Sequence, residues 1–232
     1  HPYKIVNLNQ GSPEWLSWRR NKITASMSAA IMGLDPWTTP LMLYNRILSA
    51  EEIPDNEFMK HGRDTEAEAR GWLATQTGKA YIPVCMESIE HPWMACSLDG
   101  WREHLDPPAI EIKCPMKSID QLNSMVDMPS HYFCQMQHQM AVSGAAQMHY
   151  VTYSKSSQDG IIITVKRDDL FIQKMIPQIE TFYRRLGSFE PPDPIDGRDI
   201  FVLDDPGANE ALTQYRFACK EIEFYEKLKE GA

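Results

Sequence analysis

The sequence predicts a mixed fold of strands and helices, α/β in the broad sense and α+β in its arrangement. Three observations support this. Residues 97–113 have the pattern of a β-hairpin, residues 148–166 have the pattern of a second hairpin, and helical patterns cover 55–77, 168–186 and 209–228. At 232 residues the chain is also long enough to bury a sizeable core.

The first hairpin carries the pattern on which the functional interpretation depends. Its first strand is expected to end near Arg102, with a turn at 106–108 and a returning strand at 109–113. Successive side chains of a strand point to opposite faces. The two isoleucines of the returning strand therefore share one face, and Glu111 shares the other with Lys113.

A glutamate and a lysine on one strand face are a weak signal, because exposed strands often carry such ion pairs. Asp99, on the partner strand, could bring a second carboxylate to the same face as Glu111. Two carboxylates, a backbone carbonyl and the nearby Lys113 suit a hard cation such as Mg²⁺. The hairpin therefore predicts either a cross-strand ion pair or a metal site.

Composition and charge exclude several classes of protein. The five cysteines are scattered without a Cys-x-x-Cys pair, which fits a reducing cytoplasm and argues against a disulfide framework, a zinc site and an iron–sulfur cluster. No apolar run approaches a transmembrane span, and no signal-peptide pattern opens the sequence. Because the net charge is −9, any contact with DNA has to come from a local cluster of lysine and arginine.

Helix signals organise the N-terminal part. Ser12 and Pro13 start a helix that carries Arg19, and a second short helix is expected to start at Thr24 or Ser26. The hydroxyl groups at this second start are expected to act as N-caps. A helix N-terminus beside Arg19 is, alternatively, a phosphate-binding site.

The other elements follow from the same signals. We expect further helices at 38–50, 55–77, 118–125, 130–144, 168–186 and 209–228, strands at 81–86, 93–97, 148–154 and 160–166, and an extended connection at 189–206. Glu66 and its charged neighbours on the helix 55–77 are interpreted first as a solvated face. In the helix after Pro129, Gln135 and Gln139 lie four residues apart and share a face with Tyr132.

Five sequence blocks occur in a fixed order between residues 11 and 145. They are Glu14-Trp15-x-x-Trp18-Arg19 with Ile23-Thr24-Ala25-Ser26, Gly62-x-x-x-Glu66-x-x-Ala69-Arg70, Ser97-x-Asp99-Gly100, Glu111-Ile112-Lys113-Cys114-Pro115 and Gln135-Met136-Gln137. This order resembles the lambda-exonuclease family, the YqaJ-type phage recombination nucleases of the PD-(D/E)xK superfamily. Leu98 departs from the pattern, because many relatives have proline there, but its side chain makes no chemical contribution.

The resemblance implies a PD-(D/E)xK restriction-endonuclease-like core, in which helices flank a central mixed β-sheet. It implies a single nuclease domain over 1–232, with the core at about 11–187 and a C-terminal extension and helix at 188–232. It also implies a metal site that holds Mg²⁺, with two ions expected and Mn²⁺ as a substitute. The implied ligands are Asp99, Glu111, the carbonyl of Ile112 and Glu66.

The resemblance further assigns roles in a reaction. Lys113 is expected to orient or deprotonate the attacking water, and Gln135 to bind the phosphate or orient the lysine. Arg19 and Ser26 are expected to bind a 5′-terminal phosphate. The implied enzyme is a 5′-to-3′ exonuclease that digests one strand of linear double-stranded DNA to mononucleotides and leaves a 3′ tail for recombination.

The family also implies partners and a location. A ring-shaped homotrimer around DNA, a single-strand annealing protein as partner and the cytoplasm of a bacterial host of a phage or prophage are expected. Two alternatives stay open. One is an endonuclease of the same superfamily with the same Asp99, Glu111 and Lys113 core. The other is a catalytically inert protein that binds DNA ends, against which the complete set of three residues argues.

Overall fold

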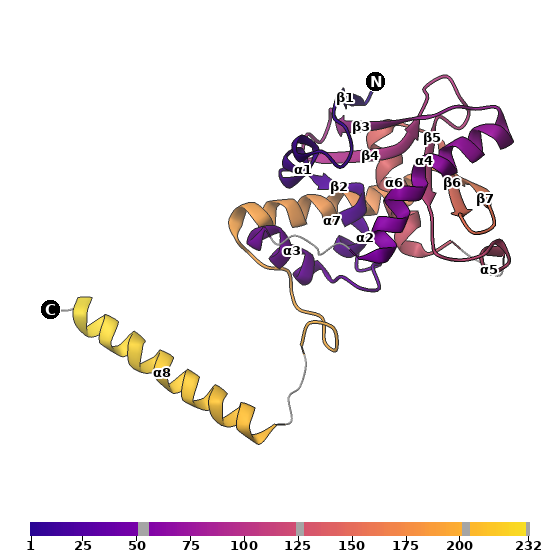
Figure 1. Cartoon of the computed structure of the whole chain (residues 1–232). Coiled ribbons are helices and arrows are strands. Elements are labelled where there is room, and N and C mark those ends of the chain that lie inside the picture. Colours follow the sequence, from indigo (N-terminus) through magenta and orange to yellow (C-terminus); the bar gives the residue numbers. More distant parts are fainter. Residues whose placement is uncertain (51–55, 124–127, 201–204, 231–232) are drawn as a thin grey trace. The chain divides into compact units, whose positions relative to one another are not determined.

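The strands predicted from alternating residues assemble into one mixed sheet in the computed structural model (Figure 1). The structure describes residues 1–50, 56–123, 128–200 and 205–230. The strand order is β1-β3-β4-β5-β6-β7, and β2 pairs with β4 off this path. The strands are β1 Tyr3–Val6, β2 Ile23–Thr24, β3 Ile82–Ser88, β4 Met94–Trp101, β5 Ala109–Lys113, β6 Gln147–Ser154 and β7 Asp159–Lys166.

Both predicted hairpins are present, and their strands pair antiparallel as β4 with β5 and β6 with β7. The two hairpins are joined in parallel, because β5 pairs with β6 from Ala109↔Met148 to Lys113↔Thr152. A parallel pair needs a crossover connection, and the segment that carries α5 and α6 supplies it. The predicted central mixed sheet is confirmed.

The helices divide between two compact units, His1–Asp193 and Pro194–Ala232. The first unit contains α1 Pro13–Arg20, the 3₁₀ turn η1 Ala25–Met27, α2 Ser28–Ile31, α3 Pro40–Ser49, α4 Glu57–Thr77, α5 Ile119–Asn123, α6 Ser130–Ser143 and α7 Asp169–Ser188. The second contains α8 Pro206–Glu230. In the described part of the chain, no helix is long and apolar enough to cross a membrane.

Local capping sets the ends of the long helix α4. The Asn56 side chain accepts a hydrogen bond from the Met59 backbone at the start, and Gly78 ends the helix with a positive φ of 67°. Two residues that the sequence placed in helices, Asp55 and Met125, lie outside the described residues. The strand β3 ends two residues beyond its predicted end at 86, and β4 lies within the predicted strand that starts at 93 and ends near Arg102.

Because side chains alternate along β5, its apolar and charged residues lie on opposite faces of the sheet. Ile110 and Ile112 belong to a buried cluster that includes Ala69 and Leu73 of α4. On the other face, the carboxylate of Glu111 contacts side chains of α6. The predicted separation of isoleucines from charged residues is therefore confirmed, and the charged face lies against α6.

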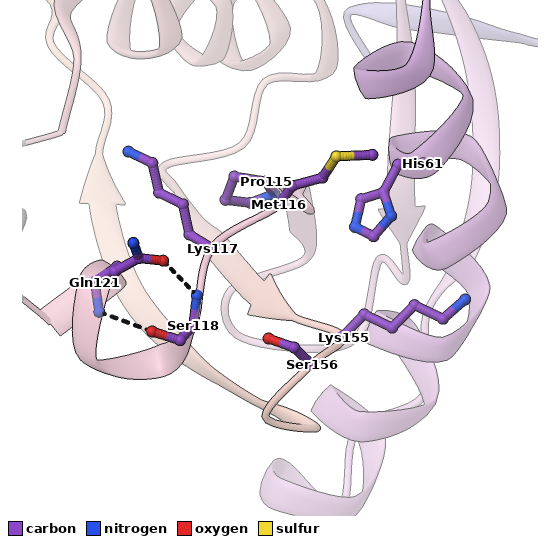
Figure 2. Close-up of a pocket in the computed structure, with 8 residues that line it drawn as sticks. All are labelled: His61, Pro115, Met116, Lys117, Ser118, Gln121, Lys155 and Ser156. Atoms are coloured by element: carbon purple, nitrogen blue, oxygen red, sulfur yellow. Dashed lines mark hydrogen bonds between the residues drawn. The ribbon is translucent and has the colours of Figure 1, made fainter.

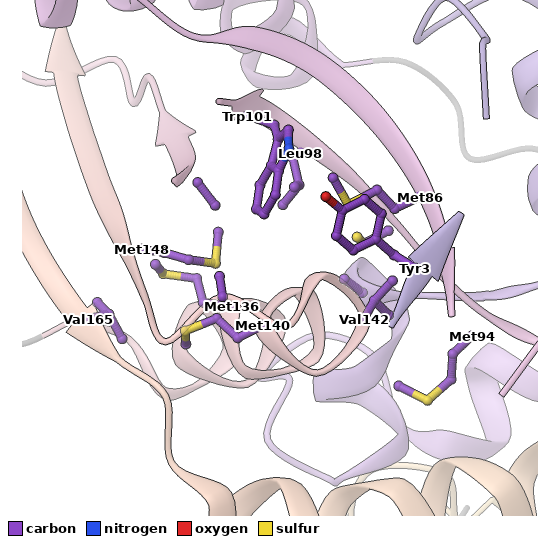
Figure 3. Packing of buried hydrophobic residues seen from close by; sticks show 14 of the residues in the cluster. Tyr3, Met86, Met94, Leu98, Trp101, Met136, Met140, Val142, Met148 and Val165 are labelled. Carbon is purple, nitrogen blue, oxygen red and sulfur yellow. The ribbon is translucent and has the colours of Figure 1, made fainter. Parts of the chain in front are cut away.

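The core between the sheet and α6 is rich in methionine. Figure 3 shows Met136 and Met140 of α6 facing the strand residues Met148 and Leu98, and all four are fully buried. Methionine is flexible and polarizable, so it fills irregular gaps between a helix and a twisted sheet. Each such buried side chain contributes about 1.5–3 kcal/mol of transfer free energy. This packing holds α6 in place beneath Glu111.

Gly100, directly after Asp99, is required by close packing. A Cβ atom at this position would lie 2.6 Å from the Cβ of Tyr81 and 2.7 Å from the side chain of Ile110. Neither neighbour is at the end of a long flexible chain, so a larger residue would push β4 away from β5. The glycine therefore keeps Asp99 next to the strand that carries Glu111.

The predicted N-caps at Thr24 and Ser26 are wrong. Residues 23–24 form the short strand β2, parallel to β4, and η1 starts after Thr24 without a side-chain cap. The hydroxyl groups of Thr24 and Ser26 instead lie 3.2 Å from each other. Pairing with β4 holds Thr24 in extended conformation, so the α-helix begins only at Ser28 and its four residues are too short to form a helix-terminus anion site.

His138 of α6 is a buried polar residue of the core. Its Nδ1 lies 2.6 Å from the Ser28 hydroxyl, and its Nε2 lies 3.1 Å from the carbonyl oxygen of Ala95. The carbonyl can only accept, so Nε2 carries the proton and Nδ1 accepts from Ser28. Burial lowers the pKa of His138 to about 3, so the imidazole is neutral in the folded protein. These contacts give the histidine a structural role.

We expect His138 to make the fold acid-sensitive. Below the unfolded-state pKa of about 6.5 the unfolded chain binds a proton that the folded chain does not, so stability falls as the pH falls towards 3. The loss is about 1.4 kcal/mol for each pH unit below about 6. Urea unfolding of the wild type and of His138→Gln between pH 7 and 5 measures it. The variant should show the shallower pH dependence, and equal slopes would contradict the assignment.

Candidate functional site

Glu111 lies at the centre of a cluster of polar side chains at the end of β5. It is only 2% exposed. Its Oε1 accepts hydrogen bonds from Lys113 Nζ and Gln135 Nε2, both at 2.6 Å, and its Oε2 accepts one from Gln139 Nε2 at 2.6 Å. A buried carboxylate requires such partners. The predicted residues Glu111, Lys113 and Gln135 are therefore brought together.

Lys113 is a positioned cation. Its Nζ lies 3.4 Å from Gln135 Oε1 and 4.7 Å from the centre of the Tyr132 ring. Burial alone lowers the pKa of Lys113, but the charges of Glu111 and Asp99 outweigh burial and raise the pKa above its ordinary value. The ammonium therefore stays charged at neutral pH. Charge stabilisation and orientation of water suit it better than proton abstraction.

Asp99 joins this cluster from β4. Its Oδ2 accepts a hydrogen bond of 2.7 Å from the backbone N–H of Ile112. The strands β4 and β5 pair at Gly100↔Ile110 and Trp101↔Ala109. The N–H of Ile112 lies beyond these pairs and is therefore available to the Asp99 side chain. Burial is the largest cause that raises the pKa of Asp99.

Crowding of carboxylates adds to this shift. The charges of Glu111 and Glu66 raise the pKa of Asp99 further, and Lys113 and the N–H of Ile112 oppose the rise. The net pKa lies well above its ordinary value. The carboxyl groups of Glu111 on β5 and Glu66 on α4 are thus both close enough to repel that of Asp99. A cation would relieve this repulsion.

Glu66 is held by Arg70, which the sequence interpretation left without a role. Arg70 Nη1 donates to Glu66 Oε1 at 2.5 Å and to the carbonyl oxygen of Asp99 at 2.9 Å. The arginine therefore ties α4 to β4 beside the cluster. The solvated-face interpretation of Glu66 does not describe this geometry, since its side chain is only 27% exposed. The i, i+4 spacing of Glu66 and Arg70 was the available signal.

Gln139 is the second residue that was given no role. It is fully buried, and besides Glu111 its Nε2 lies 3.4 Å from the carbonyl oxygen of Ser97. Gln135 and Gln139 lie one turn apart on α6 and hold opposite oxygens of the same carboxylate. Their shared helix face, together with Tyr132, was visible in the sequence. Which strand this face would meet was not.

The donor chemistry of the cluster fits a hard cation. Among the described residues, no group of three or more His, Cys, Asp or Glu side chains is gathered closely enough to hold a metal ion. Arg70 and Lys113 neutralise the carboxylates in this geometry. The repulsion at Asp99 and the oxygen-only carboxylate donors are nevertheless the chemistry that Mg²⁺ prefers. Glu66 would have to exchange Arg70 for the ion.

Arg19 and Ser26 form a second cluster, as the sequence predicted. Arg19 Nη2 donates to Ser26 Oγ at 3.0 Å and to Thr24 Oγ1 at 3.3 Å, and its guanidinium carbon lies 4.3 Å from the centre of the Trp15 ring. Burial lowers the pKa of Arg19, partly opposed by Cys85. An arginine nevertheless remains charged in proteins.

Both clusters are attached to β4. Trp15, which supports the Arg19 guanidinium, donates from Nε1 to Ser97 Oγ at 2.9 Å. Ser97 stands two residues before Asp99 on the same strand. One rigid strand therefore positions a fixed arginine and a carboxylate cluster relative to each other.

A basic hollow of about 380 Å³ opens beside the segment that follows β5 (Figure 2). His61 comes from α4, Lys117 from the segment after β5 and Lys155 from the turn between β6 and β7. The other lining residues are Pro115, Met116, Ser118, Gln121 and Ser156. The eight lining residues include none of the predicted site residues. Pro115, in the wall of this hollow, is two residues from Lys113 along the chain.

A family comparison identifies the chain. The family model of the YqaJ-like viral recombinase domain matches residues 14–146, which is more than half of the chain. The chain belongs to the YqaJ-like viral recombinase family. All predicted site residues lie within the matched range, and the resemblance drawn from the sequence is confirmed. A comparison with curated proteins gives no match.

Solved structures show the same fold. LHK-Exo in complex with dAMP is 25% identical, with a TM-score of 0.64 over 77% of this chain and 94% of that one. The alkaline exonuclease LHK-Exo from Laribacter hongkongensis, at 24% identity and a TM-score of 0.63, has the same coverage. A phage-related exonuclease from Haemophilus somnus is 15% identical, with a TM-score of 0.57 over 72% and 96% of the two chains.

These similarities support a nuclease of the phage recombination type with a PD-(D/E)xK-like fold. Nucleases of this family generally use divalent metal ions and act on DNA. The identity of the metal, the polarity of digestion and the assembly belong to the proposal that follows.

Proposed function

We propose that this member of the YqaJ-like family is a Mg²⁺-dependent 5′-to-3′ exonuclease. It digests one strand of linear double-stranded DNA to mononucleotides and leaves a 3′ single-stranded tail for homologous recombination. The observation that carries this proposal is the buried Glu111 carboxylate, bonded by Lys113 and Gln135 beside Asp99. This arrangement combines metal-binding oxygens with a fixed cation at one strand end.

Asp99, Glu111, the carbonyl of Ile112 and Glu66 would hold the metal. Mg²⁺, in one or two ions and replaceable by Mn²⁺, supplies charge stabilisation and an activated water when bound. Gln139 and Gln135 fix the carboxylate of Glu111, so this ligand needs no reordering when DNA arrives. Arg70 holds Glu66 near the site until Glu66 exchanges this arginine for the metal ion.

Lys113 acts on the water and on the phosphate. Its charged ammonium, held by Glu111 and Gln135, orients the attacking water and offsets the charge that develops on the phosphate oxygens. Gln135 has a second task, because one N–H of its amide can bind the scissile phosphate while the other keeps its hydrogen bond to Glu111. The chain thus divides the reaction between metal ligands and one fixed cation.

Arg19 and Ser26 supply the polarity. A terminal phosphate carries more negative charge than an internal diester, and a guanidinium binds it through two parallel hydrogen bonds. Trp15 holds the Arg19 guanidinium in place, so little side-chain entropy is lost on binding. The hydroxyl of Ser26 adds a third contact. Binding of a terminal phosphate by this cluster would make digestion start at a 5′ end.

We expect a linear duplex with 5′-phosphate ends to be digested at least tenfold faster than the same duplex with 5′-hydroxyl ends. Charge-assisted contacts contribute about 1.5–3 kcal/mol each. Arg19→Ala should slow only the phosphorylated substrate, and Arg19→Lys should restore part of the difference. Initial rates of nucleotide release measure this, with Arg20→Ala as the control. Equal wild-type rates on both ends would remove the assigned polarity.

A linear duplex labelled at one 5′ or one 3′ end tests the proposed activity itself. Release of labelled mononucleotide from the 5′ end with Mg²⁺, and none with EDTA, is the expected result. Cleavage of a closed circular duplex would indicate an endonuclease of the same superfamily. Binding of ends without nucleotide release would indicate an inert end-binding protein.

The remaining predictions rest on the family resemblance. They are a ring-shaped homotrimer around the duplex, a single-strand annealing protein as partner and a place in the cytoplasm of a bacterial phage host. One nuclease domain over 1–232, with a core at about 11–187 and an extension at 188–232, also stays a prediction. Light scattering with and without DNA measures the assembly.

A further inference from the structure

Trp37 is exposed beside the proposed site. All six tryptophans lie in the described part of the chain, and the other five are buried or half-buried. Trp37, in the loop between α2 and α3, is 72% exposed. An exposed indole presents a large aromatic face to solvent, where a ligand can contact it.

The loop holds Trp37 in a defined orientation. Asp35 Oδ1 accepts hydrogen bonds from the backbone N–H groups of Trp37 and Thr38, both at 2.8 Å. The indole also contacts the ring of His131 edge-on, with centres 5.2 Å apart and planes at 75°. These contacts fix the ring and leave most of its surface in solvent.

A chain of ring contacts joins Trp37 to Lys113. The ring centres of His131, at the start of α6, and Tyr132 lie 4.1 Å apart. Lys113 Nζ lies 4.7 Å from the centre of the Tyr132 ring. The pKa of His131 is lowered, mainly by burial; the charge of Asp35 opposes this shift and the charge of Lys113 adds to it. The imidazole is therefore close to both the loop and the lysine. Trp37 therefore stands at the rim of the site.

We infer that Trp37 is a stacking platform for a nucleobase of the strand that enters the site. The inference rests on the proposed nuclease function and adds a contact to it. Every base has an aromatic face, so stacking on an indole tolerates any sequence. An exonuclease needs this tolerance, because each turnover presents a different base. The metal and phosphate contacts described above hold only the backbone, and a ring contact holds the base itself.

The ring contacts limit which base can stack. Neighbouring bases of one strand are ~3.4 Å apart along the helix axis. The three contacts keep the indole within about four such spacings of Lys113 Nζ. A base removed at one of the first four positions of the digested strand should therefore weaken the contact. Removal of a base farther along should not.

The experiment compares initial digestion rates on linear duplexes that carry one abasic residue at position one, two, three, four or ten from the 5′ end. We expect the wild type to slow about fivefold or more at one of the first four positions, as the loss of a stacked base predicts. Trp37→Leu should be slow on the intact duplex by the same factor and insensitive to the abasic residue. Trp37→Phe should keep most of the wild-type behaviour.

A second measurement is independent of turnover. The dissociation constant for a single-stranded oligonucleotide in EDTA should rise about fivefold or more in Trp37→Leu and not in Phe189→Leu. Phe189 is a matched control, because it is 75% exposed at the end of α7. If the wild type digests DNA and Trp37→Leu digests every substrate at the same rate, the proposed stacking platform is wrong and the proposed function stands. A wild type that releases no nucleotide from any linear duplex overturns the proposed function instead.

Discussion

Asp99→Asn should lower the rate of nucleotide release by about a hundredfold to ten-thousandfold, because a lost metal ligand removes several kcal/mol of charge stabilisation from the transition state. Asparagine has nearly the shape of aspartate and keeps an oxygen that can accept from the Ile112 N–H. The variant therefore isolates the lost charge from the lost hydrogen bond. Glu111→Gln should show a similar loss.

Folding should survive the change at Asp99. Burial and two neighbouring carboxylates raise the pKa of Asp99, so a neutral side chain removes repulsion from the metal-free protein. The melting temperature without metal should stay the same or rise. Glu90→Gln, at an 85% exposed side chain, is the control for activity. Near-normal digestion by Asp99→Asn would refute the metal assignment.

Lys113→Met should abolish measurable turnover and leave binding of DNA within about threefold of the wild type, since the lysine acts on water and on transition-state charge. Methionine has nearly the length of the apolar stem of Lys113. It removes the ammonium group, which lies over the Tyr132 ring. Single-turnover digestion and binding in EDTA separate the two effects.

Stability gives this prediction a check. Glu111 loses a cation in Lys113→Met but keeps its bonds from Gln135 and Gln139, so the fold should persist with a lowered melting temperature. Lys4→Met, at an exposed residue of β1, is the control for the removal of one positive charge. If Lys113→Met loses binding as severely as turnover, the lysine is a substrate anchor and the assigned role is wrong.

Local rules made much of the fold predictable from the sequence. Ser12 caps α1, and Gly78 and Gly144 end α4 and α6, because caps and left-handed glycines act within one turn of a helix. The period of two in β5 placed Glu111 with Lys113, because alternation is a property of the strand alone. The five ordered blocks identified the family.

Tertiary packing decided the partners of these residues. Gln139 and Arg70 meet the site only because α6 packs on one face of the sheet and α4 on the other, bringing together residues 28 or 29 apart in the chain. The parallel register of β2 with β4 overruled the caps expected at Thr24 and Ser26. Trp37 drew no attention in the sequence, because its ring contact with His131 spans two separate segments.

The sequence by itself determined the family, the carboxylate and lysine on one strand face, and the ends of the long helices. Only the tertiary structure decided that two glutamines grip opposite oxygens of Glu111, that Arg70 holds Glu66, and that an exposed indole stands at the rim. The reason is physical. Hydrogen-bond periodicity and caps depend on neighbours in the chain, whereas the partner of a buried charge depends on which surfaces pack together.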